Sequence, residues 1–236
     1  MSFSKELLTL KERVLDELAL SFRRIEQMSE ENTLKVLTAM RECKVSDIHF
    51  NTSSGYAYDD IGRSKLEELY AKVFAAESAL VRTQFVSGTH ALATVLFGIL
   101  RPGDKLVSLT GAPYDTMQTV IGYTASSSGS LKEYGILYDE LPLNEGCVDV
   151  ERIADVLDER TKMVLIQRSR GYSRRPTLLI EDIREICNQV HRLRPDCICF
   201  VDNCYGEFVE SLEPTQAGAD IMAGSLIKNP GGGLAP

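Results

Sequence analysis

A lysine that follows an apolar segment and precedes a run of glycines gives the strongest chemical signal in the sequence. Lys228 follows residues 221–226, which are typical of a short buried strand, and precedes the glycines at 231–233. Burial disfavours the cationic form of a lysine and leaves a nucleophilic amine, as a Schiff-base lysine requires. An exposed lysine in a flexible turn is the alternative. The segment is not a P-loop, because the lysine of that motif follows its glycines.

Three further segments place polar or aromatic residues where predicted strands end. Residues 87–90, with the sequence Ser-Gly-Thr-His, combine a glycine with a helix start, whose amides favour an anion such as phosphate. A plain strand-to-helix turn is the alternative there. Tyr114 brings an aromatic ring to a second strand end, where it either packs or contacts a ligand. Asp202 directly follows the apolar residues 197–201 and serves either as a helix cap or as a partner for a ligand.

Strand-like and helix-like segments alternate through most of the chain. The predicted strands are residues 79–86, 105–109, 134–141, 163–167, 197–201 and 221–226, and the predicted helices are 89–100, 115–121, 150–157 and 181–193. This alternation indicates a doubly wound α/β domain, with a mainly parallel sheet in a three-layer α/β/α arrangement. Ligands bind such sheets outside the carboxyl ends of the strands, so the residues named above are expected to lie near one edge.

The N-terminal region reads as helical. Residues 3–43 predict two amphipathic helices, with apolar residues recurring every three or four positions and Ser29 capping the second helix. Residues 44–58 predict a loop, and Ser64 with Glu67 forms a capping box that would open the next helix. We therefore expect a helical segment over residues 1–45 and a large α/β domain over residues 46–236.

Composition limits the classes of function. The chain has 236 residues, of which 44% are apolar, and its net charge of −8 argues against nucleic acid as a partner. No apolar run approaches the ~20 residues that a membrane span needs, and no secretion signal opens the chain. We expect a cytoplasmic protein with reduced cysteines and no membrane partner.

Two other kinds of site are weaker hypotheses. A zinc site at Cys197, Cys199 and Cys204 lacks the paired C-x-x-C spacing, and the first two alternate along a predicted strand as core thiols do. We therefore expect no metal site. A nucleotide-binding Rossmann domain is disfavoured because no G-x-G-x-x-G follows the first predicted strand.

The order of these features resembles the fold-type I pyridoxal-phosphate enzymes, in particular their cysteine and methionine metabolism branch. Within it, the chain is most similar to the aluminium-resistance proteins, which are cystathionine β-lyase-like or methionine γ-lyase-like. The segments that carry the resemblance are residues 55–63, 87–91, 201–207 and 225–236. The resemblance covers essentially the whole chain, and the order and spacing of its segments are more specific than any one motif.

The resemblance implies that pyridoxal 5'-phosphate is the cofactor. Lys228 matches the Schiff-base lysine that later moves protons, and Asp202 matches the acid that pairs with the pyridine nitrogen. The amides of Gly88 and Thr89 and the hydroxyl of Ser225 match the phosphate-binding groups.

The resemblance also assigns aromatic residues and groups from a second subunit. Tyr114 matches the ring that stacks on the pyridine, although His90 is an alternative. Tyr58 and Arg63 resemble the residues that bind the phosphate of a neighbouring subunit, with Tyr56 as a less favoured substitute for Tyr58. A homodimer or homotetramer with shared active sites follows. Tyr58 or Tyr114 is then the candidate proton donor to a leaving sulfur.

The implied activity is a carbon–sulfur lyase that acts on a sulfur amino acid such as cystathionine, cysteine or methionine, by Cα deprotonation and β- or γ-elimination. An aminotransferase, a side-chain transferase and a non-catalytic truncated subunit are the alternatives. Residues 168–172 follow a predicted strand and either face the substrate or form a solvated basic loop.

Two features depart from the family pattern. Ile227 stands where the family has threonine, so one phosphate contact is expected to be missing. The chain ends at Pro236, eight residues after the lysine, whereas relatives continue into a smaller domain that supplies an arginine for the substrate carboxylate. We therefore expect the cofactor-binding part of a longer enzyme.

Overall fold

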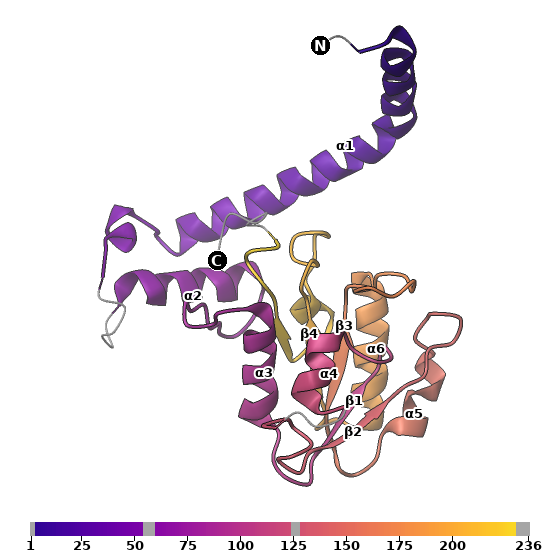
Figure 1. Ribbon diagram of the computed structural model, residues 1–236. Coiled ribbons are helices and arrows are strands. Elements are labelled where there is room, and N and C mark those ends of the chain that lie inside the picture. The colour runs from indigo at the N-terminus through magenta and orange to yellow at the C-terminus, as the bar shows by residue number, and fades with distance from the viewer. Residues whose placement is uncertain (1–2, 54–59, 124–127, 230–236) are drawn as a thin grey trace.

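A five-stranded parallel sheet forms the centre of the molecule (Figure 1). The computed structural model describes residues 3–53, 60–123 and 128–229. The strands are β1 (Lys105–Ser108), β2 (Leu137–Glu140), β3 (Thr161–Gln167), β4 (Ile198–Asp202) and β5 (Ile221–Ala223), in the order β2-β1-β3-β4-β5. Every neighbouring pair is parallel, as the alternation of strands and helices predicted.

Helices cover both faces of this sheet. The helices are α3 (Gly88–Ile99) and α4 (Asp115–Ile121) on one face, and α5 (Ile153–Val156) and α6 (Ile180–Leu193) on the other. Successive strand residues point to opposite faces, so Cys199 and Val201 of β4 join the α6 core while Phe200 joins the α3 core. The predicted three-layer α/β/α architecture is confirmed.

One long helix, α1 (Lys5–Glu42), replaces the two helices predicted for the N-terminal region. The prediction that Ser29 caps a second helix is wrong. Its carbonyl accepts a hydrogen bond from Thr33 Oγ1 at 2.7 Å, one turn further along the same helix. No glycine or proline lies between Lys5 and Glu42, so nothing in this stretch breaks the backbone hydrogen-bond ladder.

Within the described residues, α1 is anchored to the rest of the molecule through its C-terminal part. Asn32 is buried, and its side-chain amide donates to the carbonyls of Phe208 and Glu210 at 3.0 and 3.2 Å. Ala39 packs into a small core with Val73, the last residue of α2 (Ile61–Val73). The 3-10 helix η1 (Asp47–Phe50) connects the two helices within the segment that was predicted as a loop.

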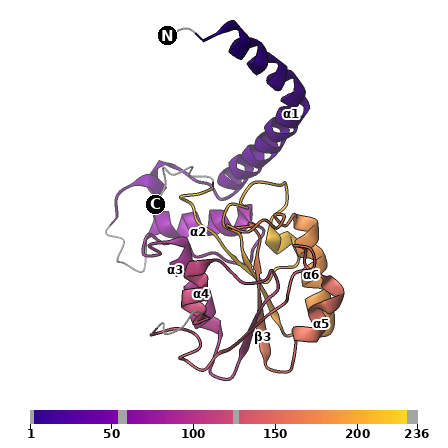
Figure 2. The same cartoon turned by 45° about the vertical axis from the view of Figure 1, so that its right-hand side comes forward.

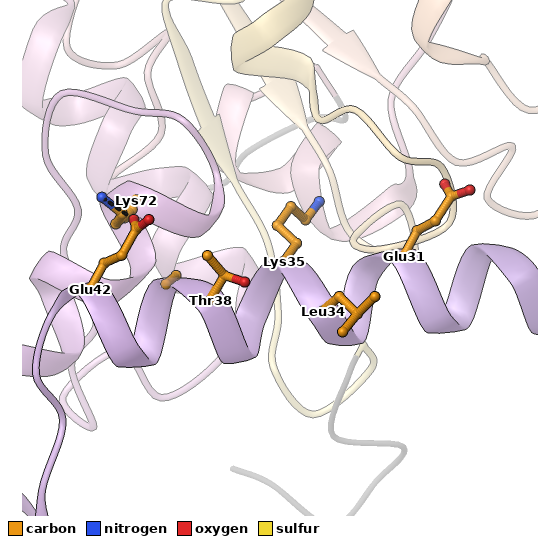
Figure 3. Close-up of a pocket in the computed structure, with 7 residues that line it drawn as sticks. Glu31, Leu34, Lys35, Thr38, Glu42 and Lys72 are labelled. Carbon is orange, nitrogen blue, oxygen red and sulfur yellow. Dashed lines mark ion pairs between the residues drawn. The ribbon is translucent and has the colours of Figure 1, made fainter.

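A groove of about 380 Å³ runs along this anchored part of α1 (Figure 3). It is lined by Glu31, Leu34, Lys35, Thr38, Ala39, Glu42 and Lys72. Glu42 pairs with Lys72 of α2 at 2.6 Å, and the Lys35 amine donates to the carbonyl of Ser211 at 3.2 Å. The groove contains none of the predicted site residues, and its charged side chains fasten α1 to the body of the protein.

Residues 79–86 do not form the predicted strand. The Val81 amide donates to the Glu67 carboxylate at 3.1 Å, and the Phe85 amide turns back to the carbonyl of Arg82 at 3.1 Å. Glu67 also forms an ion pair with Arg82. Residues 79–86 are therefore held by the Glu67 side chain and by local backbone bonds, rather than by a neighbouring strand.

The capping box predicted for Ser64 and Glu67 is also wrong. Helix α2 begins at Ile61, and the Asp60 carboxylate caps it by accepting from the Arg63 amide at 2.9 Å. The Glu67 carboxylate instead accepts from the Val81 amide and pairs with Arg82, so it does not form the capping-box bond to the backbone of Ser64.

Smaller differences concern the bounds of elements. The strands predicted at 134–141 and 221–226 shorten to β2 and β5, and the helix predicted at 150–157 divides into η2 (Val150–Arg152) and α5. A further 3-10 helix, η3 (Pro214–Ala217), precedes β5. Among the helices of the described ranges, none combines the length and the apolar character that a bilayer span requires.

Candidate active site

The carboxyl ends of the three adjacent strands β3, β4 and β5 finish level with one another. The register pairs Gln167 of β3 with Asp202 of β4, and Asp202 with Ala223 of β5. Asp202 is buried, and one of its carboxylate oxygens accepts from the Cys204 amide at 3.1 Å. Because Asp202 alternates in phase with Phe200, its carboxylate lies on the α3 side of the sheet.

The N-terminus of α3 meets this edge with unpaired backbone donors. The Ser87 hydroxyl caps the helix by accepting from the His90 amide at 3.1 Å. In the part of the chain that the structure describes, the amides of Gly88 and Thr89 donate to no protein acceptor. Ser225 lies across from them, since a Cβ at position 88 would be 3.2 Å from Ser225 Cβ and 3.6 Å from its Oγ. Glycine therefore leaves room where two amides and a hydroxyl converge, which is an arrangement suited to an anion.

Tyr114 stands beside this helix end. Its hydroxyl is 3.1 Å from Thr89 Oγ1, and its amide donates to Gln167 Oε1 at 3.1 Å. Burial raises the pKa of Tyr114 to about 12, and the nearby charge of Asp202 contributes in the same direction. The phenol is therefore protonated at neutral pH. Sequence reasoning missed Gln167, although a polar residue at the end of an apolar strand was a signal for it.

Lys228 lies in a turn beyond β5 rather than directly after a strand. Its amide donates to the carbonyl of Ser225 at 3.0 Å, and its side chain is half-buried rather than fully desolvated. The amine is 4.5 Å from the centroid of the Tyr205 ring. Burial raises the pKa of Asp202, and the positive charge of Lys228 opposes that rise, so the two side chains lie within electrostatic reach of each other.

The remaining predicted site residues make no contact with Asp202 or Ser225 among the interactions described for them. His90 is exposed, with its ring 5.8 Å from the ring of Phe85 and its Nδ1 accepting from the Val86 amide at 3.4 Å. Arg63 lies in the first turn of α2. Tyr58 and its substitute Tyr56 lie outside the described residues. The roles predicted for these residues stay predictions.

The segment 168–172 divides between a buried arginine and an exposed tip, so it is not a uniformly solvated loop, and a contact with substrate stays a prediction. Arg168 is almost completely buried, and its guanidinium donates to Asn203 Oδ1 at 2.8 Å and to the Gly206 carbonyl at 2.7 Å. Tyr172 is 94% exposed. Arg168 thus connects the end of β3 to the loop that follows Asp202, while the tip of its own segment faces solvent.

Glu207 is the most unusual polar residue near this edge, and sequence reasoning gave it no role. Its Oε1 accepts from the Ser225 amide at 3.1 Å, whereas its Oε2 is buried and has no hydrogen-bond partner within the described residues. Burial raises the pKa of Glu207 to about 7. A Cβ at position 224 would collide with Oε1, so Gly224 allows the carboxylate to reach the Ser225 turn.

The raised pKa of Glu207 predicts a pH-dependent stability. A carboxyl group whose pKa is higher in the folded state stabilises the fold below its unfolded pKa, and that contribution is lost as pH rises through about 7. Between about pH 5 and about pH 8, the free energy of unfolding is expected to fall by up to ~3 kcal/mol through this group. Glu207→Gln is expected to remove that fall, as measured by urea unfolding across this range. Glu185→Gln, at an exposed position of α6, is the control, and an unchanged pH slope in Glu207→Gln would contradict the prediction.

The cysteines weighed as zinc ligands do not gather. Cys197 precedes β4 and Cys199 lies within it, whereas Cys204 lies beyond its carboxyl end. Their three sulfur atoms do not all lie within 4.8 Å of one another, as the ligands of one ion would. Cys199, His191 and Asp220 do approach one another, but Asp220 Oδ2 is already bonded to His191 Nε2 at 2.9 Å and to the Cys199 amide at 2.7 Å.

Comparisons with known proteins agree with the resemblance drawn from the sequence. A family model described as methionine gamma-lyase matches residues 7–236. The uncharacterized protein YnbB of Bacillus subtilis is 52% identical over 215 residues, which are 90% of this chain and 51% of that protein. The chain spans about half the length of the curated relatives it matches.

Two solved structures share both fold and sequence with the chain. A protein from Listeria monocytogenes, provisionally named a cystathionine beta-lyase involved in aluminum resistance, superposes with a TM-score of 0.94 at 53% identity. That match covers 97% of this chain and 56% of the other. A carbon-sulfur lyase involved in aluminum resistance from Clostridium novyi NT gives a TM-score of 0.94 at 51% identity, covering 99% and 56%.

Proposed function

The chain belongs to the methionine gamma-lyase family, and from that premise we propose that it is the cofactor-binding part of a pyridoxal-phosphate-dependent carbon–sulfur lyase. The name of its Clostridium novyi relative supports the reaction class. The observation that carries the proposal is the meeting of Gly88, Asp202, Ser225 and Lys228 at one edge of the sheet.

The anion-binding end of α3 fits the phosphate of this cofactor. The amides of Gly88 and Thr89 point out of a twelve-residue helix, whose dipole adds to their attraction for negative charge. The Ser225 hydroxyl contributes a third donor from the opposite side. These three groups would hold the phosphate and thereby fix the position of the ring between α3 and the end of β4.

Asp202 fits the pyridine nitrogen of the same group. Burial raises the pKa of this carboxyl, so a cationic partner would be needed to keep it ionised. A protonated ring nitrogen is such a partner, and Tyr114 stands beside the N-terminus of α3 where its ring would stack on the cofactor. When bound, pyridoxal phosphate supplies a ring that accepts the electrons left at a substrate carbon after proton loss.

Proton movements are assigned to Lys228 and a tyrosine. The Lys228 amine would hold the cofactor and then take the proton from Cα of the amino acid. Tyr114, whose pKa burial raises to about 12, keeps its proton at neutral pH and can donate it to the leaving sulfur. Tyr58 is the alternative donor. The substrate class is a sulfur amino acid such as cystathionine, cysteine or methionine, with elimination at Cβ or Cγ.

The proposed site is shared between copies of the chain. Arg63 lies in the first turn of α2, and with Tyr58 it would bind the phosphate held by a neighbouring copy. A homodimer or homotetramer is then the functional unit, with residues 1–45 as a helical segment and 46–236 as the cofactor-binding domain.

Product analysis tests the reaction class. The chain, alone and fused to the C-terminal part of the Clostridium novyi lyase, is incubated with pyridoxal phosphate and cystathionine. A lyase releases a thiol, ammonia and a keto acid without any acceptor. Formation of keto acid only when an amino-group acceptor is supplied would identify an aminotransferase instead. Absence of all three products from both proteins would contradict the proposal.

A further inference from the structure

Glu207 fastens both ends of the turn that carries Ser225 and Lys228. Its side-chain Oε1 accepts a hydrogen bond from the Ser225 amide at 3.1 Å, and its backbone carbonyl accepts from Asn229 Nδ2 at 3.1 Å. Within the turn, the Lys228 amide donates to the Ser225 carbonyl at 3.0 Å. Two residues proposed for the cofactor are therefore held in place by a third residue, which comes from the loop after β4.

Gly224 makes the contact between Glu207 and Ser225 possible. A Cβ at position 224 would collide with Glu207 Oε1, whereas the backbone at this position does not adopt the positive φ that favours glycine. Glycine therefore provides room for a carboxyl group here. The loop also holds Tyr205 and Phe208, on either side of Glu207, at φ values of 70° and 61°. Backbone strain of this kind in residues other than glycine is typical of functional sites.

The Glu207 side chain is closed off from water. The residue is 5% exposed, and its Oε2 has no hydrogen-bond partner within the described residues. The yellow segment that follows β4 lies beside α2 in both views (Figures 1 and 2), and the ring of Phe208 is 5.3 Å from that of Phe74, which directly follows α2. A buried carboxylate oxygen without a donor is costly when it is charged, so this environment favours the neutral acid.

Titratable groups from several elements surround Glu207. They are Asp202 at the end of β4, Cys204 after it, Glu213 at the start of η3, Tyr70 of α2 and Lys228 of the turn after β5. Burial is the main cause that raises the pKa of Glu207 to about 7, and the charges of Glu213 and Asp202 act in the same direction. Lys228 is the cation of this group, and its charge acts on Asp202. Near neutral pH, Glu207 is thus poised between its neutral and ionised forms.

Ser225 links this carboxyl group to the proposed phosphate site. Its amide is bound to Glu207 Oε1, while its side chain lies across from Gly88, beside the open amides at the start of α3. A phosphate held by the Ser225 hydroxyl would place negative charge within one residue of Glu207. Because like charges disfavour the ionised form of a buried carboxyl group, the neutral acid is the form compatible with a bound phosphate.

We propose that Glu207 is a positioning residue for the phosphate end of the cofactor: it holds Ser225 as a neutral acid, and it takes up a proton when the phosphate binds. The proton comes from solvent, and no covalent bond of the ligand changes. This inference rests on the proposed function, because it takes the phosphate of pyridoxal phosphate as the anion at Ser225.

Isothermal titration calorimetry of the 236-residue chain with pyridoxine 5'-phosphate tests the coupling. This ligand carries the ring and the phosphate but no aldehyde, so Lys228 forms no covalent bond with it. Between about pH 6 and about pH 8, the dissociation constant of wild type, relative to that of Glu207→Gln, is expected to rise by about tenfold. At about pH 8, titrations in buffers of different ionisation enthalpy are expected to show that wild type takes up roughly one proton more per ligand than Glu207→Gln.

Two further variants separate positioning from charge. Glu207→Gln mimics the neutral acid, because an amide oxygen can still accept from the Ser225 amide, and at about pH 6 it is expected to bind within about twofold of wild type. Glu207→Leu lacks the acceptor and is expected to bind about fivefold more weakly at either pH. Glu185→Gln, at an exposed position of α6, is the matched control and is expected to keep the wild-type profile. Wild type and Glu207→Gln share every other titratable group, including His90 at the start of α3, so the difference between their pH profiles reports Glu207.

The outcomes distinguish this inference from the proposed function. Binding with the same pH profile in wild type and Glu207→Gln would overturn the coupling and leave the lyase proposal standing. Weak binding by Glu207→Gln at about pH 6 would show that the ionised carboxylate holds Ser225, and would also overturn the inference. Absence of binding to wild type would contradict the cofactor site and both proposals with it. Circular dichroism verifies that each variant is folded, and if Glu207→Leu is not, the comparison of wild type with Glu207→Gln decides.

Discussion

Replacing Lys228 by alanine is expected to abolish covalent retention of pyridoxal phosphate completely. In wild type, the amine is half-buried, lies over the Tyr205 ring and is close enough to Asp202 for its charge to affect that carboxyl. After incubation with the cofactor and reduction with borohydride, the peptide that contains Lys228 is expected to carry the added mass. Lys228→Ala is expected to lose this mass and, in a catalytically competent chain, the lyase activity, because Lys228 is the lysine of the described residues whose charge acts on Asp202.

Two controls separate this role from a merely electrostatic one. Lys228→Arg keeps the positive charge near Asp202 but has no amine that can bond to an aldehyde, so it is also expected to lose the label. Lys132→Ala removes an exposed lysine and is expected to leave the label on Lys228. Full labelling of Lys228→Ala at some other residue would contradict the assignment of Lys228 and with it the proposed chemistry.

Replacing Arg168 by methionine is expected to destabilise the fold by about 3–5 kcal/mol. The guanidinium pairs with Glu210 Oε2 at 2.7 Å, and Glu213, which is fully buried, lies 3.9 Å away. Burial raises the pKa of Glu213, and the charge of Arg168 lowers it. Without Arg168, this buried carboxylate loses a nearby positive charge, and the acceptors Asn203 Oδ1 and Gly206 O lose their donor. Urea unfolding at neutral pH measures the loss.

The cause of that loss can be isolated. Glu213→Gln in the Arg168→Met background is expected to recover part of the stability, because a neutral amide needs no counter-charge. Arg170→Met removes an exposed arginine two residues further along and is expected to change stability by less than ~0.5 kcal/mol. If Arg168→Met and Arg170→Met had equal effects, the buried cluster would not be what stabilises this loop.

The regular elements of the α/β domain could be predicted where their signals are local. The helix predicted at residues 115–121 is confirmed residue for residue as α4, and the predicted strand at 105–109 differs from β1 by one residue. Periods of 2 and 3.6 residues and the flanking turn residues are enough for such elements. Residues 79–86 had a similar apolar pattern and formed no strand, because Val81 found a side-chain acceptor 14 residues away in place of a neighbouring strand.

In the N-terminal region the prediction introduced a break that the structure does not have. The apolar spacing correctly indicated a helix, but Ser29 was interpreted as the start of a second helix. A serine inside a helix can remain part of the regular hydrogen-bond ladder without capping anything. The carbonyl of Ser29 accepts from Thr33 Oγ1, one turn further along the same helix. As a result, the exposed N-terminal half of α1 and its anchored C-terminal half are one continuous helix.

For the candidate site, the sequence alone determined the family, the strand-end positions and the residue types: a lysine, an aspartate, a glycine turn and a serine. These follow from order along the chain, and parallel strands bring their carboxyl ends to one edge. Only the tertiary structure decided how that edge is supported. Gln167 holds Tyr114 across 53 residues, Arg168 reaches Asn203 and Glu210 across 35 and 42, and Glu207 holds Ser225 across 18. Such partners meet only when distant segments pack together, because buried polar groups are paired by spatial proximity and leave no periodic pattern in the sequence.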